Sequence, residues 1–305
     1  MSDEQADLLE IVGKDLLGEG GAVSPGAVGR RSVIVGTMTG GQGKTLVSQL
    51  MAMVAIGQKL PLRVIAMDAV NPRSKEGKMA KLHIALSTLK LNNVVVETLP
   101  LEGESEKMAF FVPRNVNSQI EKLGSALMEN DCLVDLGANL VDKFVDWLRT
   151  ADPDGALLGG ANLTLVIPVT NEKVSIQRAL DTLTKLKSVN AHQIEPVLVF
   201  NEVLGQFADP KDDATIKGLL SLLNGLGGRQ VVLSNCLAYG LKVVSGLDGG
   251  LLGVVRQTAA EYQQLMKARS VFEASTDLAE LVKWTKQSMV ALFPVIIPAG
   301  FKTPQ

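Results

Sequence analysis

A glycine-rich segment in the first fifth of the sequence carries the residues with the clearest chemical meaning. It consists of Thr39, Gly40, Gly41, Gln42, Gly43, Lys44 and Thr45. Glycines let a loop bring backbone N–H groups close to an anion, and the start of a following helix adds a favourable potential. The lysine ammonium can reach the β- and γ-phosphates of a nucleotide, and the threonine hydroxyl can ligate Mg²⁺. We therefore expect residues 39–45 to bind ATP together with Mg²⁺.

The entrance of this loop departs from the common pattern GxxxxGK[ST], because Met38 stands at the position of the first glycine. We expect the loop geometry to differ there. The alternative is a glycine-rich turn with an incidental Lys-Thr pair. An apolar strand-like run before the loop and a helical pattern after it disfavour that alternative.

Three further polar residues follow apolar runs that predict strands. Asp68 follows 63–67, Asp135 ends 132–135 and Asn201 follows 196–200. Ligands of open α/β sheets bind at the carboxyl ends of the strands, so these residues are candidates for the same site. Each also has a purely structural interpretation: Asp68 as a loop cap, Asp135 as the N-cap of a following helix, and Asn201 as a turn residue.

The elements that must position these residues are indicated by an alternation of apolar runs and helical patterns. Strands are predicted at 33–35, 63–67, 94–99, 132–135, 163–169, 196–200 and 230–234, and helices at 45–56, 120–128 and 174–186. Continuous β-branched runs are typical of a parallel sheet covered by helices on both faces. The predicted fold class is α/β, with a doubly wound, mostly parallel sheet.

The domain organisation follows from changes in pattern along the chain. Residues 1–31 predict a short amphipathic helix and a flexible glycine-rich linker, and 32–250 the nucleotide-binding domain. Residues 251–305 predict a helical extension packed on the same domain. One helical face of that extension is apolar, with Leu278, Leu281, Val282, Met289, Leu292 and Phe293.

Composition excludes several classes of protein. A formal net charge of −2 argues against a polyanion-binding surface over the whole molecule. Two cysteines and two histidines are too few for a disulfide framework or a Cys- or His-rich metal site. The acidic N-terminus does not predict a secretory signal, and no apolar run is long enough to span a membrane. We expect a cytoplasmic protein.

The loop 39–45 resembles the deviant Walker A loop, KGGxGK[ST], of ParA/MinD-type ATPases, and the resemblance extends over about residues 32–250. It implies a P-loop ATPase in which Lys44, Asp68 and Asp135 are catalytic. Asp68 would position the attacking water and couple nucleotide to dimer formation. Asp135 would be the Walker B partner of the Mg²⁺ site, and Asn201 would read the adenine edge.

Thr39 stands where that family has its signature lysine, which crosses the dimer to the partner's phosphate. A cation supplied in trans is worth on the order of 10³-fold or more in phosphoryl transfer. We therefore predict a weak ATPase, with slow hydrolysis or turnover that depends on a stimulating partner. Arg73, Lys75 and Lys78 could substitute for the missing lysine, or they could form an ordinary solvated loop.

The segment after Asp135, together with the missing lysine, resembles more narrowly the StbB-type branch, which is associated with plasmid stability and conjugation. The main hypothesis is an ATP-gated switch in plasmid or DNA partition that forms an ATP-dependent homodimer and acts with an adaptor or DNA-bound partner protein. Residues 251–305 carry six basic and four acidic side chains, which supports weak non-specific DNA binding at most.

Two alternative functions remain. A MinD-like membrane-associated role is suggested by the apolar tail 290–298, although Pro294 and Pro298 are expected to break any helix there and core packing is the favoured role. A P-loop small-molecule kinase or ligase would need an acceptor site near the loop. His83 is the only histidine plausibly close to it, and we find no convincing acceptor constellation.

Overall fold

We describe the fold from a computed structural model of the chain. It describes residues 32–38, 40–58, 60–67, 81–87, 94–99, 112–129, 131–138, 140–156, 158, 163–192, 194–244, 247, 249–268 and 270–297. The predicted N-terminal helix and linker lie outside these residues, as do Thr39, Asp68 and the basic residues Arg73, Lys75 and Lys78.

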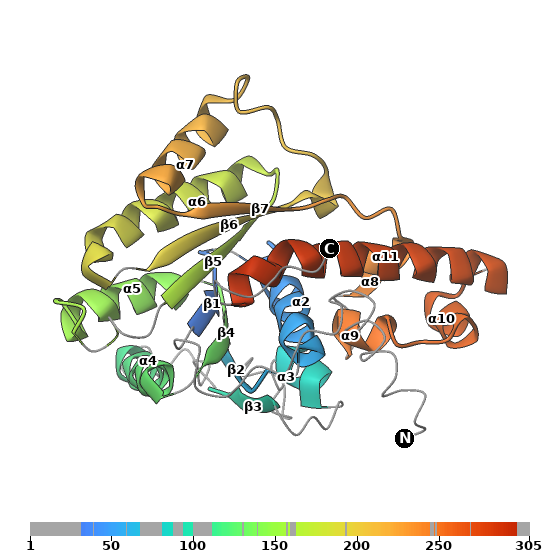
Figure 1. Cartoon of the computed structure of the whole chain (residues 1–305), viewed down its shortest axis with the longest axis horizontal. Helices are drawn as coiled ribbons and strands as arrows, with labels where there is room; N and C mark the ends of the chain where they lie inside the picture. The colour runs from blue at the N-terminus through green and yellow to red at the C-terminus, as the bar shows by residue number, and fades with distance from the viewer. Residues whose placement is uncertain are drawn as a thin grey trace.

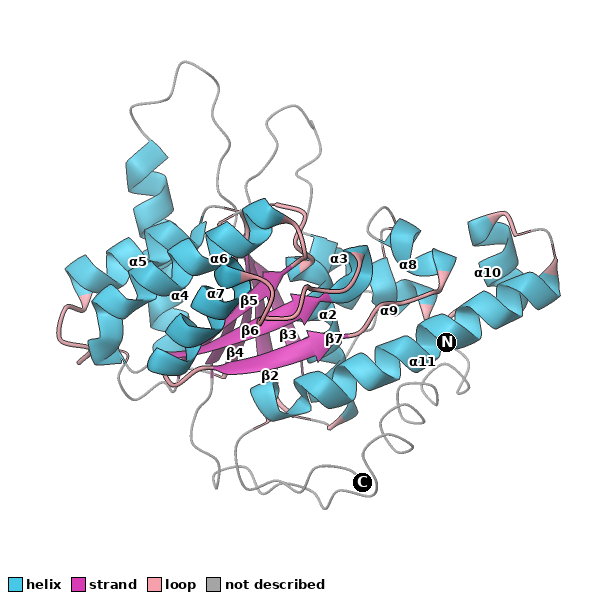
Figure 2. Ribbon diagram, turned by 90° about the horizontal axis from the view of Figure 1, so that it is seen from above, coloured by secondary structure: helices cyan, strands magenta, loops and turns pink. Residues whose placement is uncertain are grey.

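Strands and helices alternate along most of the described chain, and helices alone follow the last strand (Figures 1 and 2). The strands are β1 (Ser32–Val35), β2 (Leu62–Met67), β3 (Val94–Thr98), β4 (Cys132–Leu136), β5 (Leu163–Val169), β6 (Glu195–Asn201) and β7 (Arg229–Leu233). The helices up to β7 are α2 (Lys44–Gly57), α3 (Lys81–Ser87), α4 (Val112–Glu129), α5 (Leu140–Ala151), α6 (Lys173–Leu186) and α7 (Ala214–Gly225), with short 3₁₀ helices η1 (Lys187–His192) and η2 (Glu202–Leu204). After β7 come α8 (Tyr239–Val244), α9 (Gly250–Val254), α10 (Ala259–Met266) and α11 (Val271–Ile296).

The seven strands of the described residues form one sheet in the order β3-β2-β4-β1-β5-β6-β7, and every pairing is parallel. The chain moves in one direction from β1 to β3 and in the opposite direction from β3 to β7. Crossovers between parallel strands are right-handed, so a reversal of direction places the connecting helices on the opposite face. The predicted doubly wound α/β fold class is confirmed.

The two faces of the sheet have separate apolar cores, because neighbouring residues of a strand point to opposite sides. Val33 and Val35 of β1 pack with α2 and the C-terminal helices, whereas Ile34 packs with α4–α7. Figure 1 shows α2 and α11 on one side of the sheet and α4–α6 on the other. Both faces of the central strands are therefore buried, which explains why these strands are apolar without alternation.

Helices were harder to delimit from sequence than strands. α4 begins at Val112, eight residues before the predicted helix, in a stretch that is mostly polar. α7 was not predicted. The start of α7 does have a local signal, since the Asp213 carboxylate accepts hydrogen bonds from the N–H groups of Thr215 and Ile216.

The expectation that Pro294 breaks any helix in the C-terminal tail is wrong. α11 continues through Pro294 to Ile296. Pro294 lies in the last turn, so the helix loses only the hydrogen bond that residue 294 would donate to the Val290 carbonyl. The apolar side chains around it are buried in the core that also contains α2: Leu292, Phe293, Val295 and Ile296. Packing therefore outweighs the local cost of the proline, and these side chains are used for core packing.

No helix in the part of the chain that the structure describes is both long enough and apolar enough to cross a membrane.

Candidate nucleotide-binding site

The glycine-rich loop joins β1, at the centre of the sheet, to the first turn of α2. Gly41 and Gly43 have φ angles of 82° and 87°, in the left-handed region that side chains rarely adopt. A Cβ added at Gly40 or Gly41 would meet no atom within 4 Å. The outer side of the loop is therefore open, and a ligand can approach its backbone closely.

The N-terminus of α2 is electrostatically suited to an anion. Its N-cap residue Gly43 has no side chain, and its first turn contains no acidic residue. No carboxylate of the helix itself therefore compensates the N–H groups and the positive end of the dipole at this point. Lys44 is the first residue of the helix and adds a positive charge at the same point.

Thr45 and Asp135 meet at the base of the loop, with the Thr45 hydroxyl donating to Oδ2 of Asp135 over 2.9 Å. Sheet register brings them together, because Asp135 of β4 lies beside Val35, the last residue of β1. Asp135 is buried, at 8% exposure. A hydroxyl and a buried carboxylate oxygen next to an open loop are the oxygen ligands that Mg²⁺ prefers.

These two residues fit Mg²⁺ only as part of a larger coordination sphere. Within the described ranges, no group of three or more His, Cys, Asp or Glu side chains could hold a metal by itself. Mg²⁺ is usually bound through one or two carboxylates together with phosphate oxygens and water. The donor set thus suits a metal that arrives with a nucleotide.

The centre of the sheet therefore combines four features. They are a strand, a glycine loop with two left-handed residues, a helix that begins at lysine and threonine, and a carboxylate on the adjacent strand. The described residues thus form a doubly wound α/β sheet with a strand–loop–helix unit suited to an anion at its centre.

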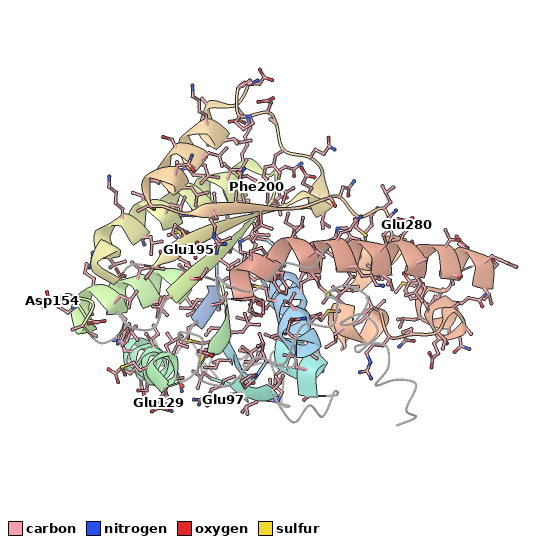
Figure 3. All side chains as sticks on the ribbon, in the orientation of Figure 1. Glu97, Glu129, Asp154, Glu195, Phe200 and Glu280 are labelled. Carbon is pink, nitrogen blue, oxygen red and sulfur yellow. The ribbon has the colours of Figure 1, made fainter. Side chains whose placement is uncertain are left out.

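Most of the predicted site residues converge at this edge of the sheet. Residues 40–45 form the loop, Asp135 contacts Thr45, and Asn201 lies at the end of β6, directly after Phe200, which Figure 3 labels. Thr39 and Asp68 lie outside the described residues, so their contributions stay predictions. Met38 is buried, at 5% exposure, so the loop entrance that lacks the usual glycine is packed against the protein.

Asn201 contacts the loop itself. Its Nδ2 donates to the Gln42 carbonyl over 3.4 Å, and its Oδ1 accepts from the Val203 N–H over 3.3 Å. A Cβ on Gly43 would lie 2.6 Å from Asn201 Nδ2, so this contact is a second reason for glycine at position 43. Asn201 is 4% exposed. Its amide can form further hydrogen bonds, and adenine recognition stays a prediction.

One residue of the site was not predicted from sequence. Thr170 follows β5 directly, and its hydroxyl donates to Oε1 of Gln42 over 2.7 Å in a buried contact. The only sequence signal was a polar residue at the carboxyl end of a predicted strand, the same signal that identified Asp135 and Asn201. Its partner Gln42 is 128 residues away, and no spacing rule connects the two.

No protein-family model matches this sequence, and no curated protein matches it either. Solved structures do show similarity. They include apo McdA from Cyanothece, at 14% identity and a TM-score of 0.43, covering 85% of this chain and 99% of that one. A ParA family ATPase from Chlorobium tepidum TLS has 16% identity and a TM-score of 0.43, covering 84% of this chain and 98% of that one.

The MinD cell division protein of Aquifex aeolicus is also similar, at 13% identity and a TM-score of 0.39, covering 82% of this chain and 97% of that one. The similar structures thus include proteins of both the ParA and the MinD type.

Proposed function

We propose that this chain is an ATP-binding molecular switch with weak ATPase activity. The observation that carries the proposal is the contact between Thr45 and Asp135 beside an open loop with two left-handed glycines. A buried carboxylate placed 2.9 Å from the hydroxyl of a Lys-Thr pair supports Mg²⁺-nucleotide binding. A glycine-rich turn without a ligand would not require that carboxylate.

Each site residue then has a role set by its chemistry. The N–H groups of the loop and the Lys44 ammonium hold the β- and γ-phosphates, and Thr45 and Asp135 hold the metal. Mg²⁺, when bound, neutralises charge on the phosphate oxygens. In hydrolysis a water oxygen bonds to the γ-phosphorus as the bond to the bridging β–γ oxygen breaks, giving ADP and phosphate. We assign Asp68 to orient that water.

The rate and the biological role follow from the sequence resemblance. With Thr39 in place of the signature lysine, we expect slow hydrolysis that a partner stimulates. We propose that ATP favours a homodimer and that the switch acts in plasmid or DNA partition, stability or conjugation, through an adaptor or DNA-bound protein. A ligand can drive such a switch only by binding one state more tightly than the other.

Isothermal titration calorimetry with Mg²⁺-ATP tests the proposal directly. We expect saturable binding to the wild-type protein and a loss of affinity on the order of 10- to 100-fold in Lys44→Ala, because a charged hydrogen-bonding group is removed. Thr45→Ala should make the affinity for ATP nearly independent of Mg²⁺, whereas Thr45→Ser should retain the dependence.

Lys217→Ala provides the matched control, because Lys217 is an exposed lysine on α7. Its affinity for Mg²⁺-ATP should equal that of the wild type. Absence of binding by the wild type, or equal binding by Lys44→Ala and Lys217→Ala, would rule out the proposed function. Sedimentation of the wild type with and without Mg²⁺-ATP tests the dimer separately.

A further inference from the structure

Gln42 occupies an unusual place in the phosphate loop. It stands between two left-handed glycines, and the neighbouring Gly40 and Gly41 are exposed, yet Gln42 itself is only 6% exposed. A polar side chain at the top of a solvent-accessible loop would ordinarily project into water. Here it turns back into the protein.

Three polar groups of Gln42 have identified partners. Its Nε2 donates to the Gly40 carbonyl over 3.2 Å, within the loop. Its Oε1 accepts from the Thr170 hydroxyl over 2.7 Å, and its backbone carbonyl accepts from Asn201 over 3.4 Å. One residue thus ties the loop to itself and to the ends of two strands.

Both anchors are themselves held. Thr170 directly follows β5, and its N–H donates to the Ser175 hydroxyl in the first turn of α6 over 2.9 Å. Asn201 ends β6 and accepts from the Val203 N–H. β5 lies beside β1 in the sheet and β6 lies beside β5, so the anchors belong to the rigid central sheet. The loop is therefore held by residues at the ends of strands on one side of β1, whereas Asp135 belongs to the strand on the other side.

The contact with Asn201 also sets the direction of an N–H group. In a planar trans peptide, the N–H points opposite to the C=O of the preceding residue. Since the Gln42 carbonyl is directed at Asn201, the Gly43 N–H is directed away from it. Without such restraint, a loop rich in glycine would lose the most conformational entropy when it closes on an anion.

We propose that Gln42 and Thr170 are a positioning pair for a nucleoside triphosphate, one that holds the phosphate loop in its binding geometry before the ligand arrives. This inference rests on the proposed nucleotide site and adds to it two residues that need not touch the ligand. Preorganisation of this kind raises affinity by reducing the ordering cost of binding.

Thr170→Val tests the pair because it removes the hydroxyl and nearly preserves the volume. We expect about a tenfold rise in the Kd for Mg²⁺-ATP, from the loss of one buried hydrogen bond that leaves Gln42 Oε1 without its donor. Thr170→Ser keeps the hydroxyl and should restore affinity to within about twofold of the wild type. Thr164→Val is the matched control, since Thr164 is equally buried at the opposite end of β5.

A double-mutant cycle separates positioning from general structural damage. If Thr170 acts through Gln42, the combined Gln42→Ala and Thr170→Val variant should bind less weakly than the product of the two single effects predicts. Thermal unfolding without nucleotide provides the structural readout. A purely structural role would lower the melting temperature of Thr170→Val and leave the Kd of the folded protein unchanged.

The outcomes separate failure of the positioning pair from failure of the nucleotide site. Wild-type binding that Lys44→Ala weakens, combined with wild-type affinity in Thr170→Val, would overturn the positioning pair and leave the nucleotide site intact. Equal losses in Thr170→Val and Thr164→Val would also overturn it. Absence of binding by the wild type would instead refute the proposed function itself.

Discussion

Thr45 and Asp135 are 90 residues apart in the sequence and 2.9 Å apart in the structure. Local chemistry explains why each is polar, since one follows the lysine of the loop and the other lies near the carboxyl end of a buried strand. Their contact depends on β4 lying directly beside β1. At the scale of single residues, each polar side chain of the site has a local explanation, and the sheet brings these side chains to one edge.

The same strand, β4, begins with a buried cysteine. Cys132 is 1% exposed, and burial, more than any other cause, raises the pKa of its thiol from its ordinary value to about 12. The thiolate is the reactive form, so the native thiol should be inert. In a Cys236→Ala variant, which leaves Cys132 as the single thiol, we expect no reaction with a disulfide reagent at pH 8 and full reaction in urea. Labelling of the native form would contradict the burial.

The raised pKa of the Cys132 thiol makes the stability of the protein depend on pH. Above the ordinary pKa of a thiol the unfolded chain releases its proton, while native Cys132 keeps it up to about pH 12. The unfolded state then binds fewer protons, so stability falls as pH rises through this range. Between pH 8 and 10, the wild type should lose about 1 kcal/mol more unfolding free energy than Cys132→Ala.

At the scale of elements, side-chain caps set the starts of α10 and α11, and a guanidinium links the end of α11 to the sheet. α10 starts with a capping box between Thr258 and Glu261, and the Ser270 hydroxyl accepts from the Glu273 N–H at the start of α11. The Arg229 guanidinium pairs with Glu195 of the neighbouring strand and donates to the Pro294 carbonyl over 3.3 Å. Strands β6 and β7 are thereby linked to the last turn of α11.

Replacing Pro294 with alanine should stabilise this last turn. Alanine supplies the N–H that can bond to the Val290 carbonyl and relieves the proline ring clash, while the contact from Arg229 to the backbone carbonyl is kept. The gain is reduced because proline also restricts the unfolded chain. We expect the unfolding free energy in urea to rise by about 1 kcal/mol, with unchanged ATP affinity. A fall in stability would show that the proline is required for the helix to end at this point.

At the scale of the whole molecule, the C-terminal helices complete the fold. The crossovers from β3 to β7 place α4–α7 on one face of the sheet, which leaves the opposite face of β5–β7 without crossover helices. Residues of α8–α11 cover that face and pack against α2 in the same core (Figure 1). The Trp284 indole N–H, which donates to the Ser234 carbonyl over 2.6 Å, fixes α11 against the segment after β7.

Leu281 and Glu280 are adjacent on α11 and test this role. Leu281 is fully buried in the core that contains α2, whereas Glu280, labelled in Figure 3, is exposed. Leu281→Ala should lower the unfolding free energy by about 2–5 kcal/mol, because it removes buried contacts and leaves a cavity. Glu280→Ala should change it by less than about 0.5 kcal/mol. Equal effects of the two substitutions in urea unfolding would show that α11 does not contribute to the core.

The sequence by itself determined the strand–loop–helix unit, the apolar strands and the polar residues that end them. These features depend on spacing over a few residues: glycine in left-handed positions, continuous apolar runs in doubly covered strands, and the Lys-Thr pair at a helix start. The α/β fold class, the loop and Asp135 could be predicted for that reason.

Only the tertiary structure decided that Thr170 meets Gln42, that Asn201 holds the Gln42 carbonyl, and that α11 continues through Pro294. Strand order and register set the first two contacts, across 128 and 159 residues, and no local window of sequence contains that information. The third depends on buried packing against α2, which outweighs an unfavourable local residue. Local propensity therefore specified the strands and helices, and the order of the strands specified which polar residues at their carboxyl ends share a site.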